Sequence, residues 1–324
     1  MASPSLSVIV PCYNAENTIE LTLRSLLQQT LRDLEIVVID DQSQDESVLV
    51  VERYARHDGR IRLVKNEKNL GIGSVRNVAL AASSAEIVGF VDADDWVTRT
   101  FFENLMESMR HPRVDFVRCG HIRVNGTERS IFETPESRRD RDLHPQESIP
   151  PVNLPSMVDY PYSWAGLYRK SFLHGAGITF QEGLYSAEDR DFTWRIHAEG
   201  RLYRCVSEYG YVYRRESNET LTRTGDRRQL DIFKAIEKIL AYVKKPGIPR
   251  IWKVKAHRQV LALVVFHHDN RERLRPEVAA EFISIARECV NSMDHELMTE
   301  ALHDFGSQRI ETVRRISSGD VAIL

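Results

Sequence analysis

Long hydrophobic runs are missing from this sequence of 324 residues. No apolar stretch approaches the about 18–20 residues that a helix needs to cross a bilayer. The N-terminus also lacks the basic segment and hydrophobic core of a secretory signal. We therefore expect a cytoplasmic protein.

Cysteine is scarce, and charge of one sign does not dominate. The four cysteines, Cys12, Cys119, Cys205 and Cys289, lie far apart and form no CxxC pair, which argues against zinc knuckles and a disulfide framework. A formal net charge of -3 and a sequence pI near 6.4 give no general attraction to nucleic acid, so we expect no nucleic-acid partner. Repeats are also absent, which argues against a solenoid.

Apolar strand patterns alternate with helical ones in the first third of the chain. Strands are expected over 6–11, 34–39, 61–64 and 87–91, and helical spacing is found over 19–31, 48–54 and 74–83. Strict alternation indicates parallel strands joined by right-handed crossovers. From about Arg227 onward the pattern is helical throughout. We expect an α/β fold with an all-helical C-terminal region.

Three acids, Asp92, Asp94 and Asp95, directly follow the apolar run 87–91. Ligands of an open α/β sheet bind at the carboxyl ends of its strands. Crowded carboxylates repel one another, and either a hard divalent cation or protonation of one member relieves the repulsion. We favour the cation. The alternative is a solvated turn in which Asp95 caps a helix that starts near Trp96.

Polar residues also follow the strand over 34–39. A carboxylate of the pair Asp40-Asp41 is well placed there to accept a hydrogen bond from the N3–H of a uracil ring, although Asp40, Asp41 or Ser43 can instead cap the next helix. Gly71 and Gly73 lack the lysine of a phosphate-binding P-loop, so we expect them to serve a tight turn. Arg76 either points toward a diphosphate or is an exposed helix arginine.

The middle of the chain holds a second acid pair and an aromatic segment. Glu188-Asp189 precedes an aromatic helix, where acids in the first turn also stabilise the helix dipole. Trp164, with Tyr162 nearby, offers a ring for the C–H face of a sugar, or else belongs to the core. The polar segment from Val124 to about Pro155 is expected to be a mobile excursion over the acceptor side, or a surface insertion without a binding role.

Five blocks of this sequence together resemble the family-2 glycosyltransferases. They are Ser7-Val8-Ile9-Val10-Pro11-Cys12-Tyr13-Asn14, Ser25-Leu26-Leu27-Gln28-Gln29-Thr30, Asp40-Asp41-Gln42-Ser43-Gln44-Asp45, Asn69-Leu70-Gly71 with Arg76-Asn77, and Asp92-Ala93-Asp94-Asp95. The resemblance implies a GT-A fold, which is Rossmann-like with a mainly parallel sheet flanked by helices. It also implies a nucleotide-sugar donor, usually a UDP-sugar, a Mn²⁺ or Mg²⁺ ion, and inversion at the anomeric carbon.

The resemblance also implies roles for individual residues. Asp41 matches the uracil-contacting acid, Asp94 the metal-binding acid, and Asp92 an acid close to the donor ribose or sugar. Asp189 matches the general base and Glu188 its supporting neighbour. The other implied contacts are Pro11, Tyr13, Glu16, Arg76, Ala93 and Arg214 for the nucleotide-sugar, and Trp164 and Tyr162 for the acceptor. Ser217 fits the family's loop over the diphosphate, but Glu216 stands where a histidine is common, which leaves the third protein ligand of the metal in doubt.

These patterns lead to one domain scheme. We expect a GT-A catalytic domain over residues 1–225, with a nucleotide-sugar half over about 1–120 and an acceptor half over about 121–225. We expect a helical C-terminal domain over 226–324. The segment Trp252-Lys253-Val254-Lys255 with Arg258 is either part of a helical cap or a basic surface for peripheral contact with the inner face of the membrane. Oligomer formation stays open.

The leading functional prediction is a metal-dependent inverting hexosyl- or N-acetylhexosaminyltransferase. It would move a sugar from a UDP-sugar to a hydroxyl of a glycan, glycolipid or cell-surface polymer, as in cell wall or capsule polysaccharide biosynthesis. A catalytically silent binding or scaffold protein is the alternative. A sugar-nucleotide pyrophosphorylase is disfavoured, because that class opens with a glycine-rich loop where this chain has Pro11-Cys12-Tyr13-Asn14.

Overall fold

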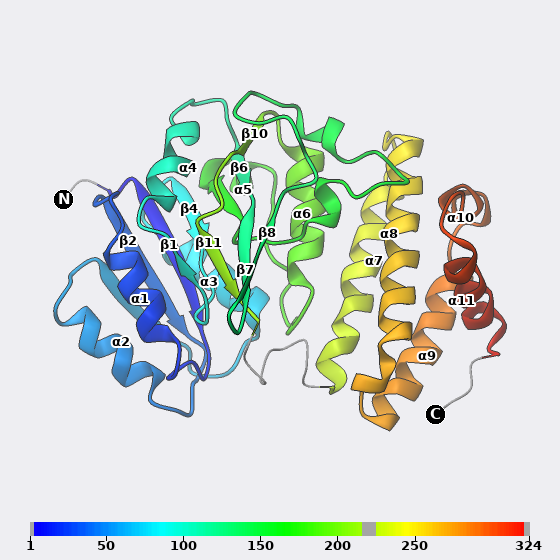
Figure 1. Ribbon diagram of the computed structural model, residues 1–324, viewed down its shortest axis with the longest axis horizontal. Helices are drawn as coiled ribbons and strands as arrows, with labels where there is room; N and C mark the ends of the chain where they lie inside the picture. The colour runs from blue at the N-terminus through cyan, green and yellow to red at the C-terminus, as the bar shows by residue number, and fades with distance from the viewer. Residues whose placement is uncertain (1–2, 216–224, 321–324) are drawn as a thin grey trace.

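The computed structural model describes residues 3–215 and 225–320 of the chain. Figure 1 shows a sheet with flanking helices on the N-terminal side and a group of C-terminal helices packed beside it. The arrangement confirms the predicted α/β architecture with a helical C-terminal region.

The main sheet has seven strands in the order β10-β6-β9-β4-β1-β2-β3. They are β1 (Leu6–Cys12), β2 (Leu34–Asp40), β3 (Ile61–Lys65), β4 (Ile87–Phe90), β6 (Phe116–Cys119), β9 (Gly166–Arg169) and β10 (Tyr203–Val206). Strands β1 to β4 are parallel, as the alternation predicts, whereas β9 runs antiparallel to both β4 and β6. The carboxyl ends of β1, β2 and β4 therefore meet at one edge.

Helices cover this sheet because each carries an apolar face. They are α1 (Ile19–Leu27), α2 (Ser47–Ala55), α3 (Ile72–Ala82), α4 (Phe101–Met109), α5 (Lys170–Gly175) and α6 (Glu188–Glu199). On α1, for example, Leu23 and Leu26 are fully buried. The start of α2 is held by Asp45, whose carboxylate accepts hydrogen bonds from the Ser47 amide at 3.0 Å and the Ser47 hydroxyl at 2.5 Å. The alternative in which Asp40, Asp41 or Ser43 caps this helix is therefore wrong.

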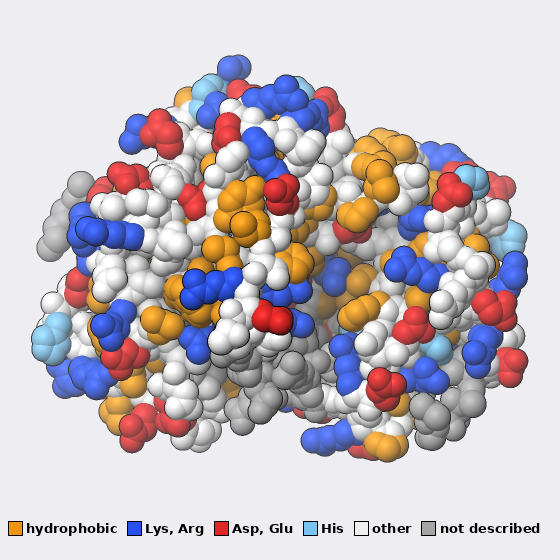
Figure 2. All heavy atoms as spheres, in the orientation of Figure 1, with side chains coloured by type: hydrophobic (Ala, Val, Ile, Leu, Met, Phe, Trp, Pro, Cys, Tyr) orange, Lys and Arg blue, Asp and Glu red, His pale blue; other side chains and the backbone are white. Residues whose placement is uncertain are grey.

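A second sheet of four strands lies against the first, in the order β5-β11-β7-β8. Its strands are β5 (Trp96–Val97), β11 (Tyr211–Arg214), β7 (His121–Asn125) and β8 (Glu128–Phe132). Trp96 thus begins a strand and α4 starts only at Phe101, so the alternative in which Asp95 caps a helix is wrong. Figure 2 shows basic and hydrophobic side chains beside one another over this sheet.

The segment 124–155, predicted as a mobile excursion, contains β8 and a 3-10 turn, η1 (Pro145–Ser148). A second 3-10 turn, η2 (Met157–Asp159), follows it. The strand was missed because β8 is an exposed edge strand with little apolar alternation, and even its Ile131 is 65% exposed.

The C-terminal helices are joined to the sheet region by a shared core. They are α7 (Asp231–Val243), α8 (Arg250–Asp269), α9 (Pro276–Asn291), α10 (His295–Ala301) and α11 (Ser307–Ser318), with the 3-10 turns η3 (Arg227–Leu230) and η4 (Arg271–Arg273). Trp194 of α6 packs in one cluster with Ile239 of α7 and Trp252 of α8. The Trp194 indole also donates a hydrogen bond to Gln259 of α8 at 2.6 Å.

The basic segment at the start of α8 faces this junction. Trp252, Val254 and Lys255 are each at most 9% exposed, and the Lys255 ammonium pairs with Asp159 at 2.5 Å. The helical-cap alternative therefore describes the packing of these residues, while peripheral membrane contact of the C-terminal helices stays a prediction. Of the helices within 3–215 and 225–320, none is long and apolar enough to span a membrane.

Candidate active site

Acids from two distant parts of the chain meet at one arginine. Asp92 follows β4, and Glu188 is the first residue of α6. The Arg76 guanidinium of α3 lies between them, with Nη2 at 3.0 Å from Asp92 Oδ1 and Nη1 hydrogen-bonded to Glu188 Oε1. Sequence analysis offered Arg76 as a diphosphate ligand or an exposed helix residue, but the side chain is buried between two carboxylates. The acid groups after β4 and at the start of α6 therefore share one site.

Two glycines and an asparagine bring α3 against the segment that leads into α6. Gly71 has φ +81, which suits the predicted tight turn. Gly73 serves a different purpose, because a Cβ there would lie 2.3 Å from the carbonyl oxygen of Gln181. Asn77 then pairs with the backbone of Phe180, with both hydrogen bonds at 2.9 Å. This backbone-to-backbone approach places Arg76 within reach of Glu188.

Asp189 is half-buried in the first turn of α6, as its sequence position predicts. Burial and the neighbouring Glu188 raise the pKa of the Asp189 carboxyl to about 7, against the opposing effects of Arg190 and Arg76. The preceding residue, Ala187, adopts the left-handed conformation with φ 61, which residues other than glycine rarely do. A carboxyl group with a pKa near neutrality is suited to exchange protons in this site.

The three acids after β4 have different environments. Asp95 is fully buried and accepts hydrogen bonds from the Tyr211 hydroxyl and the Arg214 amide, both at 2.8 Å. It therefore anchors β11, a task that sequence reasoning missed because its partners lie far along the chain. Asp94 is half-buried, and burial together with Asp92 raises its pKa to about 6.

Asp94 is the side chain best placed to hold a divalent cation. Asp92 is engaged by Arg76 and Asp95 by β11, whereas burial beside a like charge makes the ionised form of Asp94 costly without a cation. The described part of the chain has no group of three or more His, Cys, Asp or Glu side chains that would form a complete protein cage. This donor set fits Mg²⁺ or Mn²⁺ bound by a carboxylate together with substrate phosphates.

On the nucleotide side, Asp41 organises a loop. Its carboxylate accepts hydrogen bonds from the Asn66 side chain at 2.8 Å, from the Leu70 amide at 2.9 Å and from the Gly71 amide at 3.0 Å. These donors already engage both carboxylate oxygens, so the contact of Asp41 with a uracil ring stays a prediction. Sequence reasoning missed this loop-anchoring contact, although Asp41 and Gly71 both belong to the blocks quoted above.

The remaining residues assigned to the donor surround this edge of the sheet. Pro11 lies buried in β1, and Tyr13 directly after this strand is 48% exposed. Exposed Glu16 accepts a hydrogen bond from the Glu46 amide at 2.9 Å, and the buried Ala93 carbonyl accepts one from the Thr22 hydroxyl at 2.9 Å. Tyr13 thus offers an exposed aromatic ring at this edge of the sheet.

Arg214, at the end of β11, lies close enough to Asp94 to act on its charge. Its guanidinium carbon is 5.1 Å from the centroid of the Trp96 ring, and its positive charge lowers the pKa of Asp94 against the larger effect of burial. Arg214 therefore belongs to the same site as the acids after β4. Glu216 and Ser217, which the family pattern also singles out, lie outside the described residues.

Trp164 belongs to a buried aromatic cluster. Its ring stacks on Tyr211 with centroids 4.0 Å apart and on Tyr162 at 4.7 Å, and only 4% of the residue is exposed. His121 packs edge-on against it, and burial lowers the pKa of this histidine to about 3, so it stays neutral. Trp164 therefore has no open face for a sugar, whereas the half-buried Tyr162 keeps that prediction.

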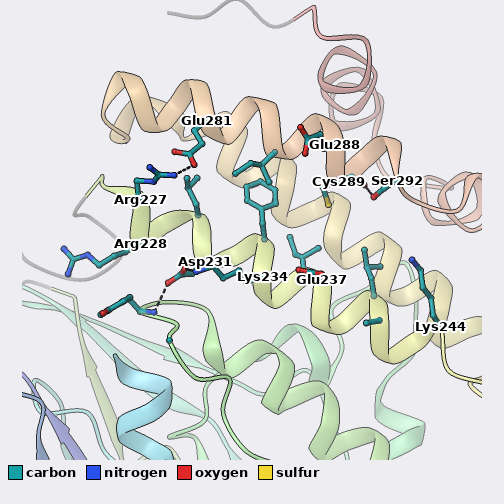
Figure 3. Close-up of a pocket in the computed structure, with 18 residues that line it drawn as sticks. Arg227, Arg228, Asp231, Lys234, Glu237, Lys244, Glu281, Glu288, Cys289 and Ser292 are labelled. Atoms are coloured by element: carbon teal, nitrogen blue, oxygen red, sulfur yellow. Dashed lines mark hydrogen bonds and ion pairs between the residues drawn. The ribbon is translucent and has the colours of Figure 1, made fainter. Parts of the chain in front are cut away.

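A pocket of about 890 Å³ lies behind the segment that leads into α6. Figure 3 shows it between α7 and α9, with Arg227 paired to Glu281 on its rim. Asp231 at the start of α7 accepts a hydrogen bond from the Tyr185 amide at 2.8 Å. Asp92, Asp94 and Asp189 do not line this pocket. Its wall residue Asp231 nevertheless binds the chain shortly before Glu188.

The solved structures most informative for the fold come from two organisms. The crystal structure of Staphylococcus aureus TarS 1-349 in complex with UDP-GlcNAc aligns with a TM-score of 0.71 and 22% identity, covering 98% of this chain and 91% of that chain. The mannosyltransferase PcManGT from Pyrobaculum calidifontis, in complex with GDP-Man and Mn²⁺, aligns with a TM-score of 0.56 and 19% identity, covering 98% and 85%. These similarities confirm the GT-A fold.

Sequence comparisons point the same way. The uncharacterized glycosyltransferase EpsJ of Bacillus subtilis (strain 168) is 33% identical over 216 residues, which are 66% of this chain and 62% of EpsJ. The poly(ribitol-phosphate) beta-N-acetylglucosaminyltransferase TarS of Staphylococcus aureus is 32% identical over 213 residues, 64% of this chain and 35% of TarS. This chain therefore spans less than two thirds of either relative. The family model described as Glycosyl transferase family 2 matches residues 7–174, more than half of the sequence, and the chain belongs to this family.

Proposed function

We propose that this chain is an inverting transferase that moves a sugar from a UDP-sugar to a hydroxyl group of a cell-surface polymer. The observation that carries the proposal is the meeting of Asp92 and Glu188 at Arg76. This contact joins two parts of one site: the donor-side acid loop, which is residues 92–95 after β4, and the base-side acid pair, which is Glu188-Asp189. The relatives suggest which substrates to test first. TarS is named for N-acetylglucosaminyl transfer to poly(ribitol-phosphate), and its structure holds UDP-GlcNAc.

Inverting transfer is an in-line displacement, in which the acceptor hydroxyl attacks the anomeric carbon opposite the leaving diphosphate. The proton of that hydroxyl needs a base on the acceptor side. Asp189 is our candidate, because its carboxylate accepts no hydrogen bond from other described residues and its pKa of about 7 lies close to working pH. Glu188 is held by Arg76 and supports Asp189 rather than replacing it.

Asp94 is our candidate for holding Mn²⁺ or Mg²⁺ on the donor side. A bound cation of this kind supplies Lewis-acid stabilisation of the charge that develops on the leaving diphosphate. Arg214 adds a fixed positive charge next to Asp94. Asp95, by tying β11 to the acid loop, keeps Arg214 in place.

A donor screen tests the proposal. The protein is incubated with UDP-GlcNAc, UDP-glucose, UDP-galactose and GDP-mannose, with Mn²⁺ or with EDTA, and nucleotide release is measured with and without poly(ribitol phosphate). Asp189→Asn should keep its affinity for UDP and lose transfer, whereas Asp94→Asn should lose metal-dependent UDP binding. Asp304→Asn, at a 67% exposed side chain far along the chain, is the matched control. Failure of the wild-type protein to bind UDP with Mn²⁺ or to release nucleotide would favour the silent-protein alternative.

A further inference from the structure

We infer that Arg76 is a positioning residue that fixes the donor-side acid loop relative to the base-side acid pair, and that it is not a ligand of the donor diphosphate. This inference rests on the proposed function. It assigns Arg76 a task different from the one its place in the family pattern implies.

The burial of Arg76 carries the first step. Its side chain is only 4% exposed, and its guanidinium carbon lies 5.3 Å from the Phe180 ring centroid and 5.8 Å from that of Phe90. Both terminal nitrogens are engaged, one by Asp92 and one by Glu188, while Nε is buried without an acceptor among the described residues. No open face of this guanidinium is presented to an incoming diphosphate.

The identity of its partners carries the second step. Asp92 lies two residues before Asp94, the candidate metal ligand, and Glu188 directly precedes Asp189, the candidate base. A planar guanidinium presents several N–H donors in a rigid fork, so it can hold two carboxylates at a set separation. A lysine ammonium at the end of a flexible chain fixes neither direction nor spacing in this way. Arg76 thus sets the distance between the two halves of the site.

The electrostatics of Asp189 carry the third step. The groups that face its carboxyl are Glu188 and Asp92, which raise its pKa, and Arg190 and Arg76, which lower it, in addition to the larger effect of burial. Removing the charge of Arg76 should therefore raise this pKa further. A residue needed only for folding would not move the pH dependence of the reaction in this way.

The test compares Arg76→Met and Arg76→Lys with Arg53→Met, a matched control at an exposed ion pair with Glu20. Calorimetry with Mn²⁺ measures the affinities for UMP and UDP, and nucleotide release measures kcat and its pH dependence. In Arg76→Met we expect the ratio of UDP to UMP affinity to stay within about twofold and kcat to fall about 100-fold, the effect of a displacement of about 1 Å at a reacting group. The acidic limb of kcat should move to higher pH. In Arg76→Lys the limb should stay in place while kcat falls less.

Three results would overturn the inference. One is a UDP to UMP affinity ratio that falls tenfold or more in Arg76→Met while kcat is kept, since it would make Arg76 a diphosphate ligand. Another is a wild-type protein that transfers sugar while Arg76→Met behaves like Arg53→Met, which would leave the proposed function intact. If Arg76→Met does not fold, Arg76→Lys decides, because unchanged kcat in a folded Lys variant would also exclude the positioning role. A wild-type protein that does not bind UDP would instead overturn the proposed function itself.

Discussion

Gly73→Ala tests how the two halves of the site are brought together. Gly73 lies in the first turn of α3, and a Cβ there would approach the Gln181 carbonyl oxygen to 2.3 Å. Ordinary contacts of a Cβ begin at 3.4 Å, so the two backbones must separate by about 1 Å. The atoms that the new Cβ would meet belong to the backbone of Gln181 and not to the flexible end of a side chain. The strain therefore falls on the segment that leads into Glu188.

Two opposing effects set the size of the change in stability. Alanine is favoured over glycine inside a helix by about 0.5–1 kcal/mol. Overpacking a close contact costs about 1–3 kcal/mol. We expect the clash to win and the free energy of unfolding to fall by about 1–2 kcal/mol. Because the same contact places Arg76 at Glu188, we also expect the rate of transfer to fall by about 100-fold.

Urea denaturation measures the first effect, and nucleotide release from the preferred donor measures the second. Gly59→Ala is the matched control, since a Cβ at Gly59 meets nothing within 4 Å and its φ is not in the left-handed region. Equal stability and equal activity of the two alanine variants would refute the reasoning. That result would mean that the segment around Gln181 adapts freely and does not set the geometry of the acids.

Three further predictions address other parts of the site. First, transfer should slow by about tenfold for each pH unit below about 7, because burial and Glu188 raise the pKa of Asp189 to about 7 and a protonated carboxyl cannot accept the acceptor's proton. Initial rates of transfer between about pH 5 and 9 measure this dependence. A rate that stays constant below about pH 7 would contradict the prediction. Second, Lys255→Met should lower the free energy of unfolding by about 1–3 kcal/mol in denaturant titrations, because Asp159 loses its buried partner, whereas Lys253→Met, which breaks no ion pair among the described residues, should cost less. Third, Trp164→Ala should destabilise the protein by about 3–5 kcal/mol in the same titration, because the ring is buried in an aromatic cluster, whereas Tyr162→Ala should mainly raise the KM for the acceptor; equal stability of these two variants would count against the different roles given to the rings.

The parallel part of the fold was predictable because β1, β2 and β4 are buried apolar runs and amphipathic helices alternate with the strands, including the more exposed β3. The antiparallel strand β9 and the second sheet were not. Gly166–Arg169 is short and gives no sign of its direction, and β8 is an exposed edge strand. Their places depend on pairing with residues far along the chain, which a local pattern does not encode.

The candidate site divides in the same way. The acids after β4 and at the start of α6 were visible as sequence motifs, and these motifs indicated a role in metal binding or catalysis. Their partners were not visible. Arg76 was expected at a diphosphate or at the surface, because nothing near it in sequence shows Glu188. The resemblance implied a sugar contact for Trp164. Its stacking on Tyr211 could not be foreseen, because this contact joins segments that are distant in the sequence.

The core that α6 shares with α7 and α8 limits how this chain can be cut or recombined. A fragment that ends before α7 would uncover Trp194 and leave its indole N–H without Gln259. A chimera that takes its final helices from another protein would need to supply the same indole acceptor and the same cation for Asp159. The helices after Arg227 are therefore exchangeable only together with the surfaces of α6 and η2 that they cover.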